Sequence, residues 1–247
     1  MSAVITLEDV TVAYRHHPAL HHLSGCFGRA SLTAVIGPNG AGKSSLLNAI
    51  TGAVPLSDGR VTLAPDMHRS LAYLPQRTSI DRSFPIRVDA LVQLGAWRKT
   101  GPFGRVTRAM RHAADEALAA VGLDGFGARL VGELSAGQFQ RVLFARLLLQ
   151  DAQLILLDEP FNAVDERTMA DMLALVHRWH GEGRTVIAVL HDMAQVRAHF
   201  PEALLLAREK IAWGATEEVL DEAHLARARR LSMAWDEDAA FCAREAA

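Results

Sequence analysis

The segment Gly37–Ser44, Gly-Pro-Asn-Gly-Ala-Gly-Lys-Ser, constrains this chain more than any other stretch of its sequence. It has the spacing G-x-x-x-x-G-K-[ST], in which a glycine-rich loop holds phosphate groups. Gly40 and Gly42 allow successive backbone N–H groups to curl around an anion. Lys43 adds a positive charge and Ser44 offers an oxygen to Mg²⁺. The segment therefore predicts a site for a nucleoside triphosphate.

The residues on either side of this loop agree with that interpretation. Leu32–Ile36 is a continuous apolar run and predicts a buried strand, whereas Ser45–Ile50 predicts a helix. The phosphates would then meet a helix N-terminus and its dipole. A glycine-rich turn without phosphate chemistry is the alternative, but it does not account for a strand, a loop and a helix in this order.

A second apolar run, Leu154–Leu157, ends in two carboxylates, Asp158 and Glu159, and then Pro160. This predicts a central strand with acids at its carboxyl end, where open parallel sheets bind ligands. We expect Asp158 to reach the Mg²⁺ held by Ser44, and Glu159 to polarise a water for attack on the γ-phosphate. The alternative is that Asp158 and Glu159 only keep the end of the strand soluble.

A third segment, Leu-Ser-Ala-Gly-Gln at 134–138, precedes an apolar helix. Ser135 and Gln138 have the spacing of a capping box, which predicts a second helix N-terminus able to receive an anion. Together with the two segments above, it resembles the signature of the ATP-binding cassette (ABC) ATPases, usually Leu-Ser-Gly-Gly-Gln. Ala136 replaces the first glycine of that pattern, which is tolerated if its φ is negative.

The resemblance covers nearly the whole chain and implies roles for four further residues. Tyr14 resembles the aromatic residue that stacks on adenine, and Gln76 the glutamine that contacts the metal and the attacking water. Asp165 resembles the loop aspartate that signals across a dimer, and His191 the switch histidine at the γ-phosphate. A lone tyrosine, glutamine or histidine is more often structural, so these assignments depend on their order around the strong motifs.

By resemblance, the chain hydrolyses ATP with Mg²⁺ at the interface of a head-to-tail dimer. The residues expected at the nucleotide are Tyr14, Gly37, Pro38, Asn39, Gly40, Ala41, Gly42, Lys43, Ser44, Ser45, Gln76, Asp158, Glu159, Asp165 and His191. Those expected to face the ATP of the partner copy are Ser135, Gly137 and Gln138. The metal is expected at Ser44, Gln76 and Asp158, and catalysis at Glu159, His191 and Gln76.

The predicted fold is a single α/β domain over residues 1–247, a phosphate-loop ABC ATPase. It has a parallel core sheet, an antiparallel sheet on the nucleotide side, and a helical subdomain at about 77–150. The strands predicted are Ile5–Tyr14, Leu32–Ile36, Gly59–Leu63, Ser70–Leu74, Leu154–Leu157, Thr185–Leu190 and Ala203–Ala207. The helices predicted are Lys43–Thr51, Arg108–Val121, Ala136–Leu149, Glu166–His180 and Met193–His199, with a further helix and tail over 217–247.

Composition agrees with an enzyme subunit outside the membrane. Half of the 247 residues are hydrophobic and the net charge is −2, which gives no reason to expect nucleic acid. Cys26 and Cys242 lack metal-ligand spacing and suit a reducing compartment. We find no signal peptide and no apolar stretch near the ~18 residues of a membrane span. The expected place is the cytoplasmic face of the cell membrane, with any pore supplied by a separate permease.

Phe84-Pro85, and Gly101-Pro102-Phe103-Gly104-Arg105 after it, resemble the branch of ABC importers that takes up zinc, manganese or iron(II). The expected cargo is therefore a divalent transition metal, with zinc favoured over manganese, delivered to the permease by a metal-binding receptor. Importers of haem, siderophores or cobalamin are the alternative.

Four histidines, His16, His17, His21 and His22, lie close together after Tyr14. They predict either a Zn²⁺ or Ni²⁺ site or a solvated turn, because no cysteine or carboxylate joins them in sequence.

Two other functions share these motifs. A chromosome-maintenance or DNA-repair ATPase needs a long heptad insertion that the sequence lacks. A non-hydrolytic interaction protein would be expected to lack Lys43 or Glu159, and both are present.

Overall fold

The structure, a computed structural model, describes residues 2–14, 17–76, 81–101, 104–162 and 164–233. The chain divides into two compact units, Met1–Arg69 with Ile187–Ala247, and Ser70–Val186. Strand β7 (Thr185–Val189) begins in the second unit and ends in the first. In the described part of the chain, no helix has both the length and the apolar character needed to cross a membrane.

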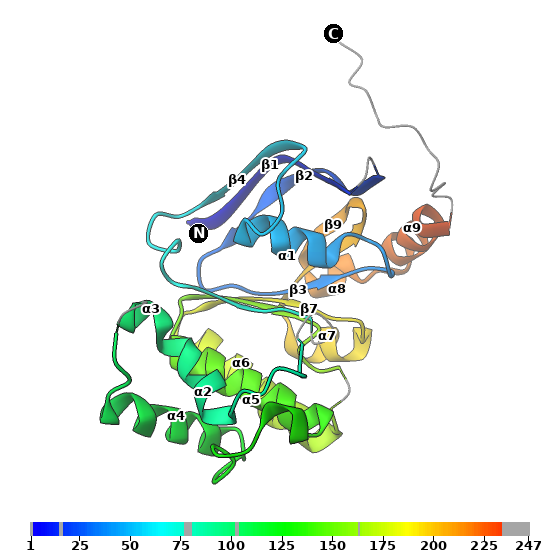
Figure 1. The fold of residues 1–247 in the computed structure, drawn as a ribbon. Coiled ribbons are helices and arrows are strands. Elements are labelled where there is room, and N and C mark those ends of the chain that lie inside the picture. Colours follow the sequence, from blue (N-terminus) through cyan, green and yellow to red (C-terminus); the bar gives the residue numbers. More distant parts are fainter. Residues whose placement is uncertain (1, 15–16, 77–80, 102–103, 163, 234–247) are drawn as a thin grey trace. The chain divides into compact units, whose positions relative to one another are not determined.

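The first unit contains two groups of strands. Its elements are β1 (Ala3–Tyr14), β2 (His17–Gly28), β3 (Leu32–Ile36), α1 (Lys43–Thr51), β4 (Asp58–Leu63), α7 (Met193–His199), β8 (Glu202–Ala207), β9 (Glu209–Ala215), α8 (Thr216–Val219) and α9 (Glu222–Met233). Strands β2, β1 and β4 form an antiparallel sheet in that order, as Figure 1 shows, and α1 contacts all three. The antiparallel sheet predicted for this part of the chain is therefore present.

Strand β3 is buried throughout and pairs in parallel with β8, as predicted for a core sheet. Strand β9, which the sequence did not predict, then pairs antiparallel with β8, so the core is mixed at this edge. Helix α9 packs against β8 and β9.

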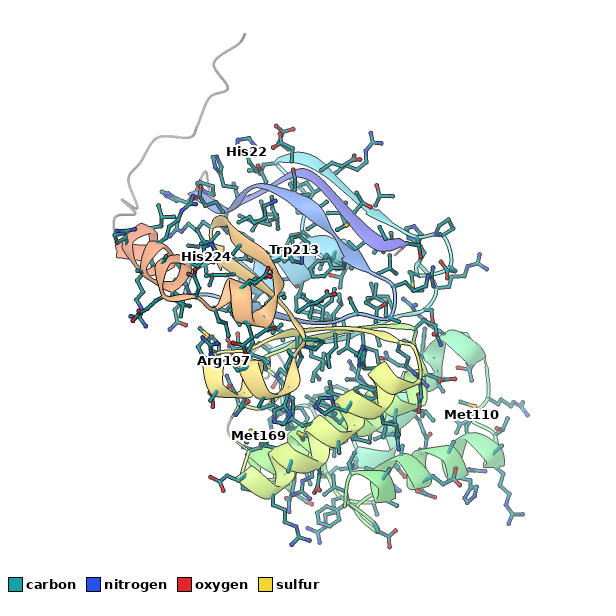
Figure 2. The ribbon with its side chains drawn as sticks, turned by 180° about the vertical axis from the view of Figure 1, so that it is seen from behind. His22, Met110, Met169, Arg197, Trp213 and His224 are labelled. Carbon is teal, nitrogen blue, oxygen red and sulfur yellow. The ribbon has the colours of Figure 1, made fainter. Side chains whose placement is uncertain are left out.

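Strand β2 was also missed, and the structure explains why. Its sequence carries three histidines and two glycines in place of a regular apolar alternation, and its register with β1 contains several shifts. Tertiary packing supplies the missing stabilisation: the rings of Phe27 and Trp213 lie 4.6 Å apart. A Cβ at Gly25 would lie 2.4 Å from the Trp213 ring, so only glycine allows the strands this close. Figure 2 shows Trp213 on β9.

The second unit is mainly helical. Its elements are β5 (Leu71–Leu74), α2 (Val88–Gln93), η2 (Leu94–Ala96), α3 (Trp97–Thr100), α4 (Arg108–Ala120), η3 (Val131–Glu133), α5 (Ala136–Gln150), β6 (Leu154–Asp158) and α6 (Glu166–Gly181). Strands β5 and β6 pair in parallel. Helix α5 packs against α2, α4 and α6, and Phe144 on it stacks on Trp179 of α6 with ring centroids 6.0 Å apart.

Candidate functional site

The phosphate loop lies between β3 and α1 of the first unit, as the sequence predicted. Gly40 and Gly42 have positive φ angles of 76° and 88°, the left-handed region that favours glycine. A Cβ at Gly42 would also lie 2.2 Å from the carbonyl oxygen of Ala19 on β2. Helix α1 begins at Lys43, so Ser44 and Ser45 occupy its first turn. The loop therefore presents the N-terminus of this helix to an anion.

Lys43 is held over this loop by the loop itself. Its ammonium donates hydrogen bonds to the carbonyl oxygens of Gly37, at 2.8 Å, and Pro38, at 2.9 Å. The side chain is buried, so these hydrogen bonds and its neighbours hold the ammonium group in one position. Lys43 therefore places a positive charge at the phosphate loop.

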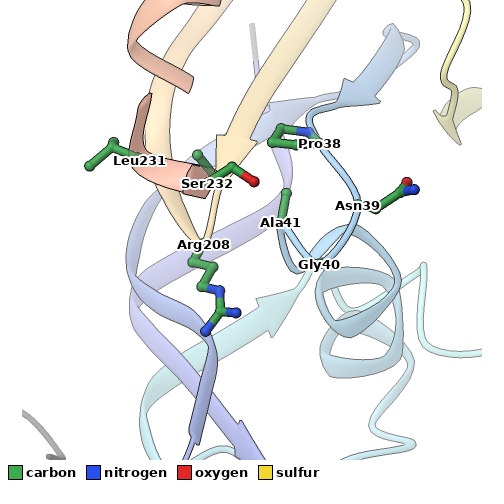
Figure 3. A pocket seen from close by; sticks show the side chains of 8 residues that line it. Pro38, Asn39, Gly40, Ala41, Arg208, Leu231 and Ser232 are labelled. Carbon is green, nitrogen blue, oxygen red and sulfur yellow. The ribbon is translucent and has the colours of Figure 1, made fainter. Parts of the chain in front are cut away.

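Two cavities adjoin the phosphate loop, and helix α9 lines both. The first, of about 240 Å³, is lined by the loop residues 38–41 and by Arg208, Leu231 and Ser232 (Figure 3). The second, of about 330 Å³, is lined by loop residues 37–39, His191 and Arg229 among others. The structure thus brings His191 beside residues 37–39 of the phosphate loop. The contribution of α9 had no signal in the sequence.

Arg208 is a residue that sequence reasoning missed. It lies at the turn between β8 and β9 with a φ of 64°, uncommon for a residue with a side chain. Its N–H donates to the carbonyl oxygen of Ala41, and its own carbonyl accepts from the N–H of His21. Arg208 therefore ties the phosphate loop to β2 through the backbone. Only the tertiary contacts reveal this.

Tyr14 lies at the end of β1, opposite His17 on β2, with 47% of its surface exposed. It lines neither of the two cavities. Its exposed ring could stack on a planar ligand, but Tyr14 does not line the cavities beside the phosphate loop.

In the second unit, β6 ends with Asp158, buried, and the chain then turns at Glu159. Glu159 has a φ of 51°, a strained conformation of the kind found at functional sites. One of its carboxylate oxygens accepts hydrogen bonds from the amides of Gln76, at 2.7 Å, and Asn162, at 2.6 Å. The structure thus joins Gln76 to Glu159, two residues predicted separately. Asn162 is a partner that the sequence analysis did not assign.

The predicted capping box is present at the start of α5. The Ser135 hydroxyl accepts from the N–H of Gln138 at 3.2 Å, and the Gln138 side chain accepts from the N–H of Ser135 at 2.9 Å. Ala136 is the first residue of the helix and its φ is not positive, so alanine is tolerated there. Gly137 lies in the same turn, and an added Cβ would come no closer than 4.0 Å to Val164.

Arg82 anchors the signature segment and was not predicted to matter. Its guanidinium donates to the carbonyl oxygen of Leu134, directly before Ser135, and lies 5.0 Å from the centre of the Phe139 ring. Phe84 follows two residues later and is 64% exposed. Arg82 therefore connects an exposed loop to the start of α5.

Asp165 caps helix α6. Its carboxylate accepts from the N–H of Thr168 at 2.9 Å and from the Thr168 hydroxyl at 2.7 Å. These hydrogen bonds, the backbone one above all, lower the pKa of Asp165. Arg141 of α5 donates to the same hydroxyl, so the cap of α6 is linked to the helix that follows the signature.

The histidine cluster lies on a strand, because His17, His21 and His22 belong to β2, while His16 is outside the described residues. His22 pairs with Asp9 at 2.7 Å, and its ring lies edge-on to that of His21. Burial, and next the neighbouring His22, lower the pKa of His21. No group of three or more metal-ligating side chains forms within the described residues. The predictions for Pro102, Phe103 and the tail 234–247 also lie outside them.

The comparisons with known proteins can now be set beside this geometry. The ABC transporter family model matches residues 20–162, a segment that runs from β2 past Glu159. The chain belongs to the ABC transporter family. Proteins of this family bind ATP and hydrolyse it for transport systems, and the chain is therefore an ATPase.

Two relatives are similar to this ABC protein over most of their length. The manganese transport system ATP-binding protein MntB of Listeria monocytogenes is 37% identical over 220 residues, which cover 87% of this chain and 92% of the relative. The zinc transport system ATP-binding protein TroB of Treponema pallidum is 39% identical over 228 residues, covering 91% and 86%.

Solved structures show the same fold. An inward-facing ABC transporter of the metal-chelate type superposes with a TM-score of 0.81 at 25% identity, over 93% of this chain and 90% of the other. A nucleotide-free ATP-binding cassette superposes with a TM-score of 0.79 at 22% identity, over 92% and 99%.

Proposed function

We propose that this ABC ATPase powers an importer of a divalent transition metal, with zinc favoured and manganese the nearest competitor. The observation that carries the proposal is the similarity, over about nine tenths of the chain, to ATP-binding subunits named for manganese and for zinc transport. An ATPase subunit does not touch the cargo, so its catalytic residues do not choose between these metals. The resemblance in the Phe84 segment supports the branch that takes up zinc, manganese or iron(II) as a whole, and zinc within that branch stays a prediction.

The nucleotide chemistry follows from the side chains described above. In this proposal Lys43 and the N–H groups of 37–44 hold the phosphates, with Ser45 in the first turn of α1 and Tyr14 on the adenine. Glu159 takes a proton from the attacking water, positioned by Gln76, while His191 contacts the γ-phosphate.

The residues fit Mg²⁺, because Ser44, Gln76 and Asp158 offer hydroxyl, amide and carboxylate oxygens, the hard ligands that this ion takes. Bound there, the ion would neutralise charge that develops on the phosphates.

A second copy of the chain completes the site in this proposal. Its capping box, Ser135 with Gln138, and the neighbouring Gly137 form an anion-binding helix start that would face the γ-phosphate. Asp165 would carry the signal between the two copies. ATP would close this head-to-tail dimer, and hydrolysis would reopen it.

The permease is proposed to dock near Phe84, an exposed aromatic side chain of the kind enriched in interfaces. Arg82 would pass its movement to the signature segment through Leu134. The chain would then act at the cytoplasmic face of the membrane, with a metal-binding receptor on the far side of the permease.

A second candidate cargo is a metal chelate such as haem, a siderophore or cobalamin. It is supported by the likeness to a transporter of the metal-chelate type. Uptake distinguishes the two: cells without this gene should lose accumulation of radioactive zinc or manganese, and wild-type protein but not Glu159→Gln should restore it. Normal metal uptake with lost uptake of cobalamin or haem would contradict the proposal.

A further inference from the structure

Helix α9 presents one face to the phosphate loop. Leu225, Ala228, Arg229 and Ser232 have the spacing i, i+3, i+4 and i+7, which places them on one side of a helix. The first three line the cavity of about 330 Å³ beside the loop, and Ser232 lines the cavity of about 240 Å³ shown in Figure 3. Helix α9, the loop and His191 belong to the same compact unit. This face of α9 is therefore a wall of both cavities.

Arg229 is the charged residue of this face, and packing does not explain it. The neighbouring Ala228 is buried, whereas Arg229 is exposed and forms no ion pair within the described residues. By contrast, Arg227 of the same helix pairs with Glu209 of β9 at 3.0 Å. A cation in the last turn of a helix can offset its dipole, but in α9 that residue is Arg230. The charge of Arg229 is thus available to a ligand in the cavity.

The cavity that Arg229 lines lies where the terminal phosphate of ATP is expected. The backbone N–H groups of such a loop cradle the inner phosphates next to the start of the following helix, which here is Lys43. Residues 37–39 form the other end of the loop, and they line this cavity together with His191. His191 is the residue proposed above to contact the γ-phosphate. Arg229 reaches the same space from α9.

We propose that the guanidinium of Arg229 binds the γ-phosphate of ATP, a role that rests on the proposed nucleotide site and adds to it a ligand from outside its motifs. A guanidinium can donate two parallel hydrogen bonds to phosphate oxygens. ATP bound to one Mg²⁺ and one lysine still carries excess negative charge, which a second cation offsets. Because ADP lacks the γ-phosphate, this contact would favour ATP over ADP.

The test compares two ligands of the purified full chain, a non-hydrolysable β,γ-imido analogue of ATP and ADP, both with Mg²⁺. Arg229→Ala should weaken binding of the analogue by roughly tenfold, through the loss of a charged hydrogen bond, and leave the affinity for ADP unchanged. Arg229→Lys keeps the charge but not the planar fork, so its affinity for the analogue should lie between those of Arg229→Ala and the wild type. Isothermal titration calorimetry measures each affinity.

The matched control is Arg230→Ala, which removes an exposed arginine that has no ion pair among the described residues and lines neither cavity. Arg230 lies about 100° further round the helix than Arg229. The control should bind both nucleotides as the wild type does. The proposal is overturned if Arg229→Ala binds the analogue unchanged, if it loses affinity for the analogue and ADP equally, or if Arg230→Ala loses as much.

Melting temperatures without nucleotide show whether the variants fold. All of them should match the wild type, because neither arginine has an ion pair to lose. If Arg229→Ala melts at a lower temperature, Arg229→Gln, which keeps a long polar side chain without the charge, takes its place in the same comparison.

Lys43→Ala keeps this proposal apart from that of the nucleotide site. It should weaken binding of ADP as well as the analogue, because the lysine of such a loop also meets the β-phosphate. If Lys43→Ala weakens both and Arg229→Ala weakens neither, the nucleotide site stands and the role of Arg229 is wrong. If Lys43→Ala binds both as the wild type does, the nucleotide site lies elsewhere and both proposals fail.

Discussion

At the scale of single residues, the carboxylate of Glu159 is the group proposed to take a proton from the attacking water. Its backbone is held in a left-handed conformation, and the amides of Gln76 and Asn162 donate to the same carboxylate oxygen. Both donors orient the carboxylate, but neither removes its ability to accept a proton. The base and its orientation are therefore separable by mutation.

Glu159→Gln should bind ATP normally and lower turnover by ~10²-fold or more, because the amide keeps the shape but cannot take a proton. Asn162→Ala is the matched control: it removes one donor and leaves the base, so turnover should fall by no more than about tenfold. Steady-state ATP hydrolysis and nucleotide binding measure both. Near-normal turnover in Glu159→Gln would show that another group is the base.

Asp165 gives a prediction about pH. Its pKa is lowered in the folded state by the hydrogen bonds from Thr168, so the ionised cap stabilises the fold at pH values above the unfolded pKa of about 3.9. This stabilisation is lost as the pH falls through the lower, folded pKa. Asp165→Asn should therefore have a lower melting temperature than the wild type at neutral pH, and this difference in melting temperature should shrink below about pH 4.

Circular dichroism melts across this pH range provide the measurement. Asp171→Asn, an exposed substitution on the same helix away from the cap, should show no such pH-dependent difference. A difference in melting temperature between the wild type and Asp165→Asn that persists below about pH 4 would argue against an ionised cap.

At the scale of elements, the start of α5 is fixed from two sides. The capping box satisfies its first N–H groups, and Arg82 holds the carbonyl of Leu134 while covering Phe139. The same Arg82 belongs to the loop that carries exposed Phe84. The loop proposed to meet the permease and the helix that follows the signature segment thus share one side chain.

Arg82→Ala should leave the KM for ATP unchanged and lower kcat by roughly tenfold, because the signature is misplaced while the phosphate loop is intact. Arg87→Ala, which removes an exposed ion pair with Asp89, is the control and should alter neither constant, since such pairs contribute little. A parallel rise in KM, or a collapse of the melting temperature, would assign Arg82 a purely structural role.

At the scale of the whole molecule, the starts of α1 and α5, both proposed to bind ATP, belong to different compact units of one chain. This arrangement leads to a test of the proposed head-to-tail dimer. Ser135→Arg and Lys43→Ala proteins, each inactive alone, should regain activity when mixed, because a mixed dimer contains one intact composite site.

Random mixing makes about half of the dimers mixed, with one working site of two, so at most about a quarter of wild-type activity should return. The control is the Ser135→Arg/Lys43→Ala double mutant mixed with wild type, in which intact composite sites form only in the wild-type homodimer. Full activity in either single mutant alone would exclude a shared site.

The sequence by itself determined the chemistry and the regular elements. Local spacing predicts the phosphate loop, the two acids at the end of β6, the capping box of α5 and the buried strands β3 and β6, because backbone conformation and apolar periodicity are local properties. The tertiary structure alone decided strands β2 and β9 and the hydrogen-bond partners of the site residues. Strands β2 and β9 are stabilised by each other through Phe27 and Trp213, and the pairing of Gln76 with Glu159 joins residues far apart in the chain. Long-range contacts of this kind leave no periodic signal, so only the folded chain reveals them.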